Sequence, residues 1–115
     1  MRDDRERLLD ILAAIDRILA KTELGRAAFE ADEMLQVWVL HNLQMVGEAA
    51  RCLSDEFRLR HPDSAWSKAV GLRNILVHHY FEIDAQQIWR VVEQDLTPLR
   101  STVASILERN DSELT

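Results

Sequence analysis

Apolar residues recur at helical spacing over most of this chain, and this spacing is the feature that most limits its fold. Between residues 8 and 19 they stand at positions i, i+3, i+4, i+7, i+10 and i+11, namely Leu8, Ile11, Leu12, Ile15, Ile18 and Leu19. One face of an α-helix repeats in this way, whereas a half-buried strand alternates every second residue. Only three glycines and two prolines occur in 115 residues, and both types disfavour helix interiors. The sequence therefore predicts an all-α fold.

Breaks in this pattern divide the chain into four or five helices. Four ranges carry the helical spacing: residues 8–19, 32–58, 65–78 and 85–96. Thr97 followed by Pro98 is typical of an N-cap with proline at the first helical position, so either a fifth helix begins there or the fourth bends. Helices with short connections favour an antiparallel bundle, and the chain has the length of one domain, residues 1–115.

The composition is that of a soluble globular protein in a reducing compartment. Hydrophobic residues make up 47% of the chain and charged residues 30%, which argues against disorder. Cys52 is the single cysteine, so an intramolecular disulfide is excluded. No apolar run approaches the roughly 20 residues that span a bilayer, and the charged N-terminus lacks the apolar segment of a signal peptide. We therefore expect a cytoplasmic protein with no membrane contact.

The charges are distributed unevenly around a basic centre. The net charge of −6 argues against a surface that binds nucleic acid everywhere. Residues 51–79 nevertheless carry five basic and three acidic side chains, together with three of the four histidines. A basic, histidine-rich centre in an acidic protein indicates a local anion site, although a chance scatter of charges explains the balance equally well.

The stretch RNILVHHY at residues 73–80 gathers several reactive side chains in this part of the chain. Its adjacent histidines, His78 and His79, invite a metal site, but neighbouring helical residues point about 100° apart and do not share a face. No HExxH motif and no cysteine or carboxylate pair stands nearby at ligand spacing, so a metal is not expected. A nucleophilic triad is also disfavoured, because no serine or cysteine occupies an elbow-like turn.

Phosphate chemistry suits the same stretch better. Arg73 carries a permanent charge and a planar fork that matches phosphate oxygens, whereas His78 titrates near neutral pH and can transfer a proton. The two residues are five apart, so on one helix they point about 140° from each other. Either the long Arg73 side chain wraps round the helix, or two copies of the helix share a composite cleft in a dimer. An exposed helix end without a catalytic role is the plainer alternative.

The motif R-x4-H-x-Y, formed by Arg73, His78 and Tyr80 with polar Asn74 after the arginine, resembles the signature of HEPN-domain RNases. More narrowly, it resembles the HepT-like toxins, which pair with a minimal nucleotidyltransferase antitoxin of the MntA type. Three flanking stretches read like the same family: LHNLQMVGEAARCLSDEFRLRHPDSAW (40–66), HHYFEID (78–84) and IWRVVEQDLTPLR (88–100). The resemblance covers nearly the whole chain.

This resemblance implies a homodimeric HEPN bundle in which the motifs of both chains line one cleft and cleave RNA without a metal or other cofactor. His78 would be the general acid/base, Arg73 would hold the scissile phosphate and its developing charge, and Asn74 would help to orient them. The antitoxin of this type VII toxin–antitoxin system would transfer AMP from ATP onto the hydroxyl of Tyr80, and the bulky anionic adduct would block the cleft. His79 occupies the variable position of the family and is assigned no role.

Two residues of the long predicted helix bear on the same site. Glu48 could orient the arginine or the histidine of the motif across the bundle, or could equally be a helix residue that faces solvent. Gly47, with Ala49 and Ala50, forms a small patch where another backbone can approach closely. That backbone could belong to the same bundle or to a second subunit, and the sequence does not separate the two.

Three classes of function are compatible with these residues. The leading hypothesis is the toxin RNase of a two-gene toxin–antitoxin pair. The second is a non-catalytic HEPN module that binds a nucleotide or substrate for a partner nucleotidyltransferase, with Arg73 gripping phosphate. The third is a structural helical protein whose motif has decayed. RNA cleavage that resists a chelator would favour the first class over the others.

Overall fold

Helices make up almost all of the chain that the structure describes. The structure is a computed structural model that describes residues 3–62, 64–78 and 84–114, with side chains at all of these positions except 64, 74–78 and 110–114. Its helices are α1 (Asp4–Lys21), α2 (Arg26–Glu30), α3 (Glu33–Arg51), α4 (Asp55–Arg60), α5 (Ser64–His78), α6 (Ala85–Gln94) and α7 (Leu96–Leu114). No strand occurs in these described ranges, and the predicted all-α fold is confirmed.

The single helix predicted over residues 32–58 is wrong, because this range forms two helices. A short break separates α3 from α4, and Ser54 is the N-cap of α4. The Ser54 hydroxyl accepts a hydrogen bond from the backbone N–H of Phe57 at 3.0 Å and donates one to the carboxylate of Asp4 at 2.6 Å. A serine cap satisfies a backbone donor at the start of a helix. The chain therefore turns at Ser54, while Phe57 stays buried.

Two further boundaries differ from the prediction. The segment between the first two predicted helices contains the five-residue helix α2. The bend near Pro98 falls at Asp95, so α7 begins at Leu96 and Thr97 lies inside its first turn. Proline is tolerated in a first turn, where its missing N–H has no helical partner. The short helices α2 and α4 explain why the described residues form seven helices instead of the predicted four or five.

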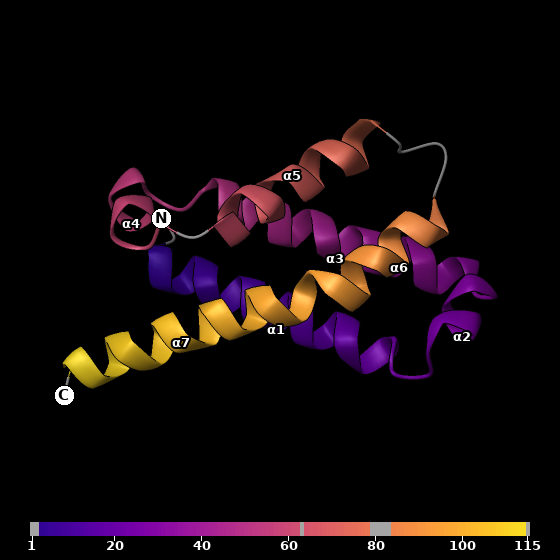
Figure 1. The fold of residues 1–115 in the computed structure, drawn as a ribbon, viewed down its shortest axis with the longest axis horizontal. Helices are drawn as coiled ribbons and strands as arrows, with labels where there is room; N and C mark the ends of the chain where they lie inside the picture. Colours follow the sequence, from indigo (N-terminus) through magenta and orange to yellow (C-terminus); the bar gives the residue numbers. More distant parts are fainter. Residues whose placement is uncertain (1–2, 63, 79–83, 115) are drawn as a thin grey trace.

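α3 lies at the centre of an antiparallel bundle (Figure 1). It packs against α1 on one side and α5 on another, and it also contacts α2 and α6. α1 and α5 run in one direction along the bundle, whereas α3 and α7 run in the other, and α7 packs against α1. The predicted antiparallel arrangement is therefore confirmed, and the end of α5 lies alongside the first half of α3.

The core is built from the apolar faces of these helices. Its largest fully buried side chains include Leu8, Ile11, Ile15 and Ile18 of α1, four of the residues whose spacing predicts the first helix. Full burial of one such side chain contributes about 1.5–3 kcal/mol, so these four residues of α1 supply a major part of the hydrophobic stabilisation. None of the described helices is both long enough and apolar enough to cross a membrane.

Candidate functional site

Gly47 brings α3 and α5 into close contact at the position of Arg73. A methyl group at position 47 would lie 3.0 Å from both Cβ and the backbone nitrogen of Arg73, and 3.2 Å from the carbonyl oxygen of Ala69. Ordinary contacts between carbon atoms are longer, about 3.5–4.0 Å, so only a residue without a side chain fits without a shift. The small patch around Gly47 therefore serves packing within the bundle.

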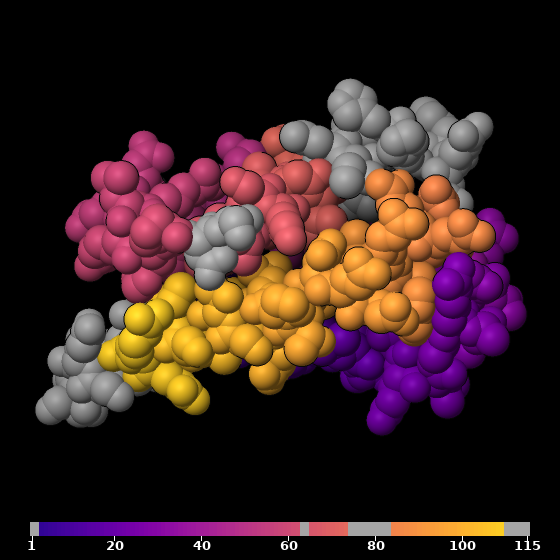
Figure 2. All heavy atoms as spheres, viewed as in Figure 1, coloured from indigo at the N-terminus to yellow at the C-terminus, as the bar shows by residue number. Residues whose placement is uncertain are grey.

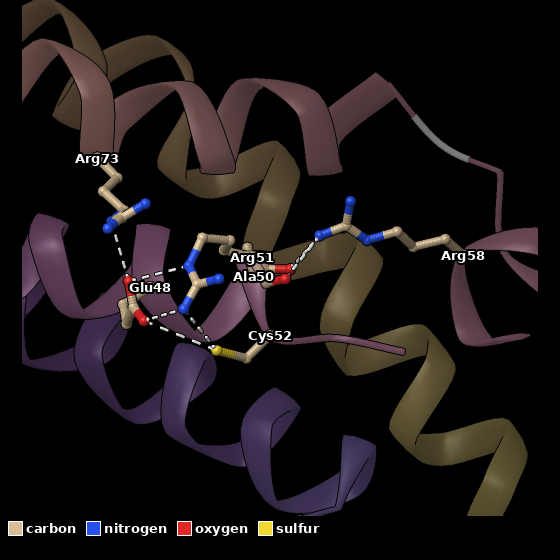
Figure 3. A network of polar contacts seen from close by, with 6 residues as sticks. All are labelled: Glu48, Ala50, Arg51, Cys52, Arg58 and Arg73. Carbon is tan, nitrogen blue, oxygen red and sulfur yellow. Dashed lines mark hydrogen bonds and ion pairs between the residues drawn. The ribbon is translucent and has the colours of Figure 1, made fainter. Parts of the chain in front are cut away.

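The next residue of α3, Glu48, forms an ion pair with Arg73 of α5. The Arg73 Nε atom lies 3.0 Å from Glu48 Oε2, and the two side chains are 44% and 46% exposed. Figure 3 shows the carboxylate pointing toward the guanidinium from the neighbouring helix. Because an exposed ion pair contributes little to folding stability, its main consequence is to restrict the orientation of Arg73. Glu48 thus contacts the motif arginine, while nearly half of its side chain still faces solvent.

Arg51 contacts the same carboxylate from within α3. Its Nη2 atom lies 2.6 Å from Glu48 Oε1, and its Nε atom lies 3.3 Å from Oε2. The hydrogen bond from Arg51 has the largest effect and lowers the pKa of Glu48. Burial opposes it as the second-largest effect, and the charges of Arg51 and Arg73 lower the pKa further. The thiol of Cys52 lies 3.7 Å from Oε1. Glu48 is therefore ionised at neutral pH and holds two guanidinium groups together.

This lowered pKa predicts a specific dependence of stability on pH. Above the ordinary Glu pKa of 4.5, the ion pairs of Glu48 contribute fully; as the pH falls from there through the lowered folded-state pKa, their contribution is lost. We expect Glu48→Gln to lower the free energy of unfolding by less than about 1 kcal/mol at pH 7 and to have no effect at the acid end. Thermal unfolding of wild type and Glu48→Gln, from pH 7 to the acid end, would measure the difference in stability. A difference that grows toward acid pH would contradict the lowered pKa of Glu48.

The structure describes the remaining motif residues only in part. The backbone of Asn74 and His78 belongs to α5, but their side chains, and the whole of His79 and Tyr80, lie outside the described residues. Arg73 and Glu48 are thus the two predicted site residues that the structure brings together. Within the described part of the chain, no group of three His, Cys, Asp or Glu side chains could hold a metal ion.

The sequence interpretation assigned no role at this site to Arg51 or Cys52. A signal for Arg51 was present, because Glu48 and Arg51 stand at i and i+3, the spacing of ion pairs on a helix surface. The sequence alone could not indicate that the same carboxylate also reaches Arg73, since that contact depends on the packing of α3 against α5.

A separate hollow of about 280 Å³ lies between α5 and the junction of α6 with α7. Figure 2 shows the face on which these helices border one another. The hollow is lined by residues that include Lys68, Leu72, Asp95 and Leu99, and none of the lining residues belongs to the predicted motif. A mixed lining of one cation, one anion, two neutral polar residues and apolar side chains selects no clear ligand, so the candidate site is the cluster around Glu48.

Comparisons with known proteins point in the same direction as the motif. The family model Ribonuclease HepT-like matches residues 11–106. A relative from Methanocaldococcus jannaschii, provisionally named an RNase, is 34% identical over 103 residues, which cover 89% of this chain and 94% of the relative. A relative from Thermococcus cleftensis, named a probable ribonuclease HepT, is 31% identical over 100 residues, which cover 86% of this chain and 91% of the relative. No solved structure shows significant similarity to the chain. The family match extends over most of the sequence, and the chain belongs to the HepT-like ribonuclease family.

Proposed function

We propose that this protein is an endoribonuclease that acts as the toxin of a toxin–antitoxin pair. The observation that carries the proposal is the Glu48–Arg73 ion pair, which orients the motif arginine at the surface of a chain in the HepT-like ribonuclease family. An arginine whose orientation is already restricted loses less conformational freedom when it binds phosphate. The two relatives described above are both named as RNases, which supports the proposed activity.

In the proposed reaction, the 2′-hydroxyl of RNA attacks the neighbouring phosphorus, and the bond from phosphorus to the 5′-oxygen of the next nucleotide breaks. His78 accepts the hydroxyl proton or donates a proton to the departing oxygen, and Asn74 helps to orient the phosphate. Arg73 stabilises the negative charge that develops on the phosphoryl oxygens. Glu48 contacts Nε of Arg73, so the two terminal nitrogens can bind phosphate as a pair. The products are a 2′,3′-cyclic phosphate and a 5′-hydroxyl, and no metal takes part.

The proposed active form is a homodimer that pairs through an exposed side of α3. Met34, Val37 and Met45 are exposed apolar residues at 83%, 49% and 42%, and exposed His41 lies between them. Their spacing of i, i+3, i+7 and i+11 places all four on one side of the helix. Large exposed apolar residues in a row on a helix favour contact with another protein. We call these four residues the α3 stripe.

A second copy of the chain fits the α3 stripe by charge. The N-terminal end of α3 carries the acidic residues Asp32 and Glu33, and its C-terminal end carries Arg51 beside Arg73. A twofold axis across the stripe would run the two α3 helices antiparallel, with the acidic end of each helix near the basic end of the other. A symmetric contact of this kind uses the same patch on both copies.

The same axis would bring the two motifs together. Because α3 and α5 run antiparallel and Gly47 packs against Arg73, the end of α5 at His78 lies about level with the middle of the α3 stripe. A twofold axis through the stripe therefore places the ends of both α5 helices on either side of the axis. This arrangement supports the composite cleft that the 140° offset between Arg73 and His78 suggests.

The α3 stripe predicts that a charge introduced within it separates the subunits. We expect Met45→Glu to convert a dimer into a monomer, because its carboxylate would be buried against the second subunit. We also expect it to lower RNA cleavage at the same protein concentration. Light scattering after gel filtration would measure the mass. Leu24→Glu is a matched control, since Leu24 is 87% exposed and lies outside the stripe. Equal masses for both variants would contradict the stripe as the dimer interface.

The proposed regulation is the transfer of AMP from ATP onto Tyr80 by an MntA-type nucleotidyltransferase antitoxin, as in a type VII toxin–antitoxin system. The tyrosine oxygen would attack the α-phosphorus of ATP, pyrophosphate would leave, and the phenolic proton would be released. Added phosphate beside Arg73 would compete with the RNA phosphate for the same guanidinium.

Co-expression with the cognate nucleotidyltransferase tests this regulation. We expect the mass of one AMP on a peptide that contains Tyr80, and we expect Tyr80→Phe to carry no adduct and to escape this route of neutralisation. Tandem mass spectrometry would locate the adduct. An adduct on another residue, or neutralisation of Tyr80→Phe through AMP transfer, would contradict the proposal.

Expression of the protein alone in bacteria tests its function as a toxin. Growth should stop with the wild-type protein and continue with Arg73→Ala or His78→Ala, provided that both variants accumulate as folded protein. If both variants arrest growth as strongly as wild type, the active-site assignment is wrong. If the purified wild-type protein binds RNA but leaves it intact, the protein is a non-catalytic module instead.

A further inference from the structure

The Glu48 carboxylate is shared by two arginines, in contrast to the ion pairs of Asp16 and Glu30. Arg73 Nε and Arg51 Nε lie 3.0 Å and 3.3 Å from the same oxygen, Oε2, so their guanidinium groups are close neighbours. Asp16 pairs with Arg100, and Glu30 pairs with Arg26. Those pairs are electrically neutral, whereas the cluster around Glu48 keeps one net positive charge on a chain of net charge −6.

The Arg51 side chain is not needed to cap the C-terminal carbonyl groups of α3. The last carbonyl groups of a helix lack helical partners, and a nearby arginine commonly satisfies them. Here Arg58 performs this task, because its Nη2 donates to the carbonyl oxygens of Ala50 at 2.8 Å and Arg51 at 3.1 Å. Figure 3 shows Arg58 reaching the end of α3 while the Arg51 side chain extends toward Glu48.

Both arginines keep donors for a ligand. A guanidinium has five N–H groups, and the contacts of Arg51 with described residues use Nε and Nη2. Those of Arg73 use Nε. The Arg51 side chain is 46% exposed in a single copy of the chain, and it lies six residues beyond Met45, outside the α3 stripe, so solvent reaches it. Two neighbouring guanidinium groups with free donors suit an anion that carries more than one phosphate, and the RNA backbone is such an anion.

We propose that Arg51 is a second phosphate-binding residue, which holds an RNA backbone phosphate adjacent to the one bound by Arg73. This inference rests on the proposed nuclease function and extends its substrate site along the strand. Glu48 would keep the two guanidinium groups side by side, so that one strand can contact both.

RNA binding by the His78→Ala variant tests the proposal without cleavage. The probe is a fluorescent single-stranded RNA of twelve nucleotides, titrated at several salt concentrations. We expect Arg51→Ala in this background to weaken binding several-fold and to reduce the slope of log K against log salt by about 0.7, the value for one phosphate contact on a single strand. Arg51→Lys should retain most of the slope. Arg100→Ala, which removes the same charge from an equally exposed ion pair, should leave the slope unchanged.

Steady-state cleavage by the single variant Arg51→Ala separates binding from positioning. We expect KM for the same RNA to rise while kcat stays near that of wild type. A fall in kcat at unchanged KM would make Arg51 a positioning residue for Glu48 and would overturn the proposal. A salt slope equal to that of Arg100→Ala would also overturn it, even if Arg73→Ala still abolished cleavage. Failure of the nuclease function itself would show differently, as intact cleavage in both Arg73→Ala and His78→Ala.

Discussion

Replacing His78 with alanine is expected to lower the rate of RNA cleavage by about 10²–10⁴-fold, the usual contribution of a positioned acid or base. Arg73→Ala should cost about 10²–10³-fold, because it removes charge stabilisation of the pentacovalent phosphorus. Arg73→Ala should not unfold the protein, since the Arg73 side chain is 44% exposed and its ion pair is screened by solvent. Single-turnover cleavage with the variant in excess over RNA would measure both rates.

The neighbouring histidine provides the control for this prediction. His79→Ala removes the same side chain one residue later, at a position to which the motif assigns no role. We expect this variant to cleave RNA at a rate close to that of wild type. If His79→Ala loses activity and His78→Ala retains it, the acid/base assignment is wrong, and the motif would have to be read in a different register.

The second large effect is expected from adding one methyl group at Gly47. Its Cβ would lie 3.0 Å from the backbone nitrogen and Cβ of Arg73, so α5 would have to move away from α3. Overpacking of this kind costs about 1–3 kcal/mol, which exceeds the helix-propensity gain of up to about 1 kcal/mol for Gly→Ala. We expect Gly47→Ala to lower the free energy of unfolding by up to about 2 kcal/mol, and to reduce cleavage because Arg73 shifts relative to Glu48.

Gly71 provides a control for this prediction, because it is a second helical glycine but has open space where a Cβ would lie. A methyl group there would meet no atom within 4 Å. Gly71→Ala should therefore raise the stability by up to about 1 kcal/mol through helix propensity alone. Chemical denaturation of the two variants would compare them directly. A stabilised Gly47→Ala would mean that α3 and α5 can separate at little cost, and that Gly47 does not fix the position of Arg73.

Most of the fold was predictable because its core follows a single periodic signal. The apolar spacing of residues 8–19 corresponds to α1, and the antiparallel order of the long helices follows from short connections. The break at Ser54 was missed because the buried apolar pattern continues across it, through Leu53 to Phe57. The bond from Ser54 to Asp4 joins residues 50 positions apart, and local sequence patterns do not record such a contact.

The candidate site was predictable only within each helix. Arg73 and His78 belong to α5, so their chemistry could be considered from one stretch of sequence. Their assignment to an active site, and that of Tyr80 to a modification site, came from the resemblance to HEPN-domain RNases. The position of Glu48 beside Arg73 depends on how far α3 approaches α5, which Gly47 permits. The sequence indicated that a backbone can come close at Gly47 but not which one. The sharing of Glu48 between Arg51 and Arg73 follows from that approach and has no separate signal in the sequence.

The most direct test of the central claim is cleavage of RNA by the purified protein in the presence of EDTA, with the new RNA ends identified by mass spectrometry. Wild-type protein should cut single-stranded RNA at a rate that the chelator does not change, and should leave 2′,3′-cyclic phosphate and 5′-hydroxyl ends. His78→Ala should cut the same RNA at least about 10²-fold more slowly. Cleavage that EDTA abolishes, or that continues unchanged in His78→Ala, would contradict a metal-independent active site built from Arg73 and His78.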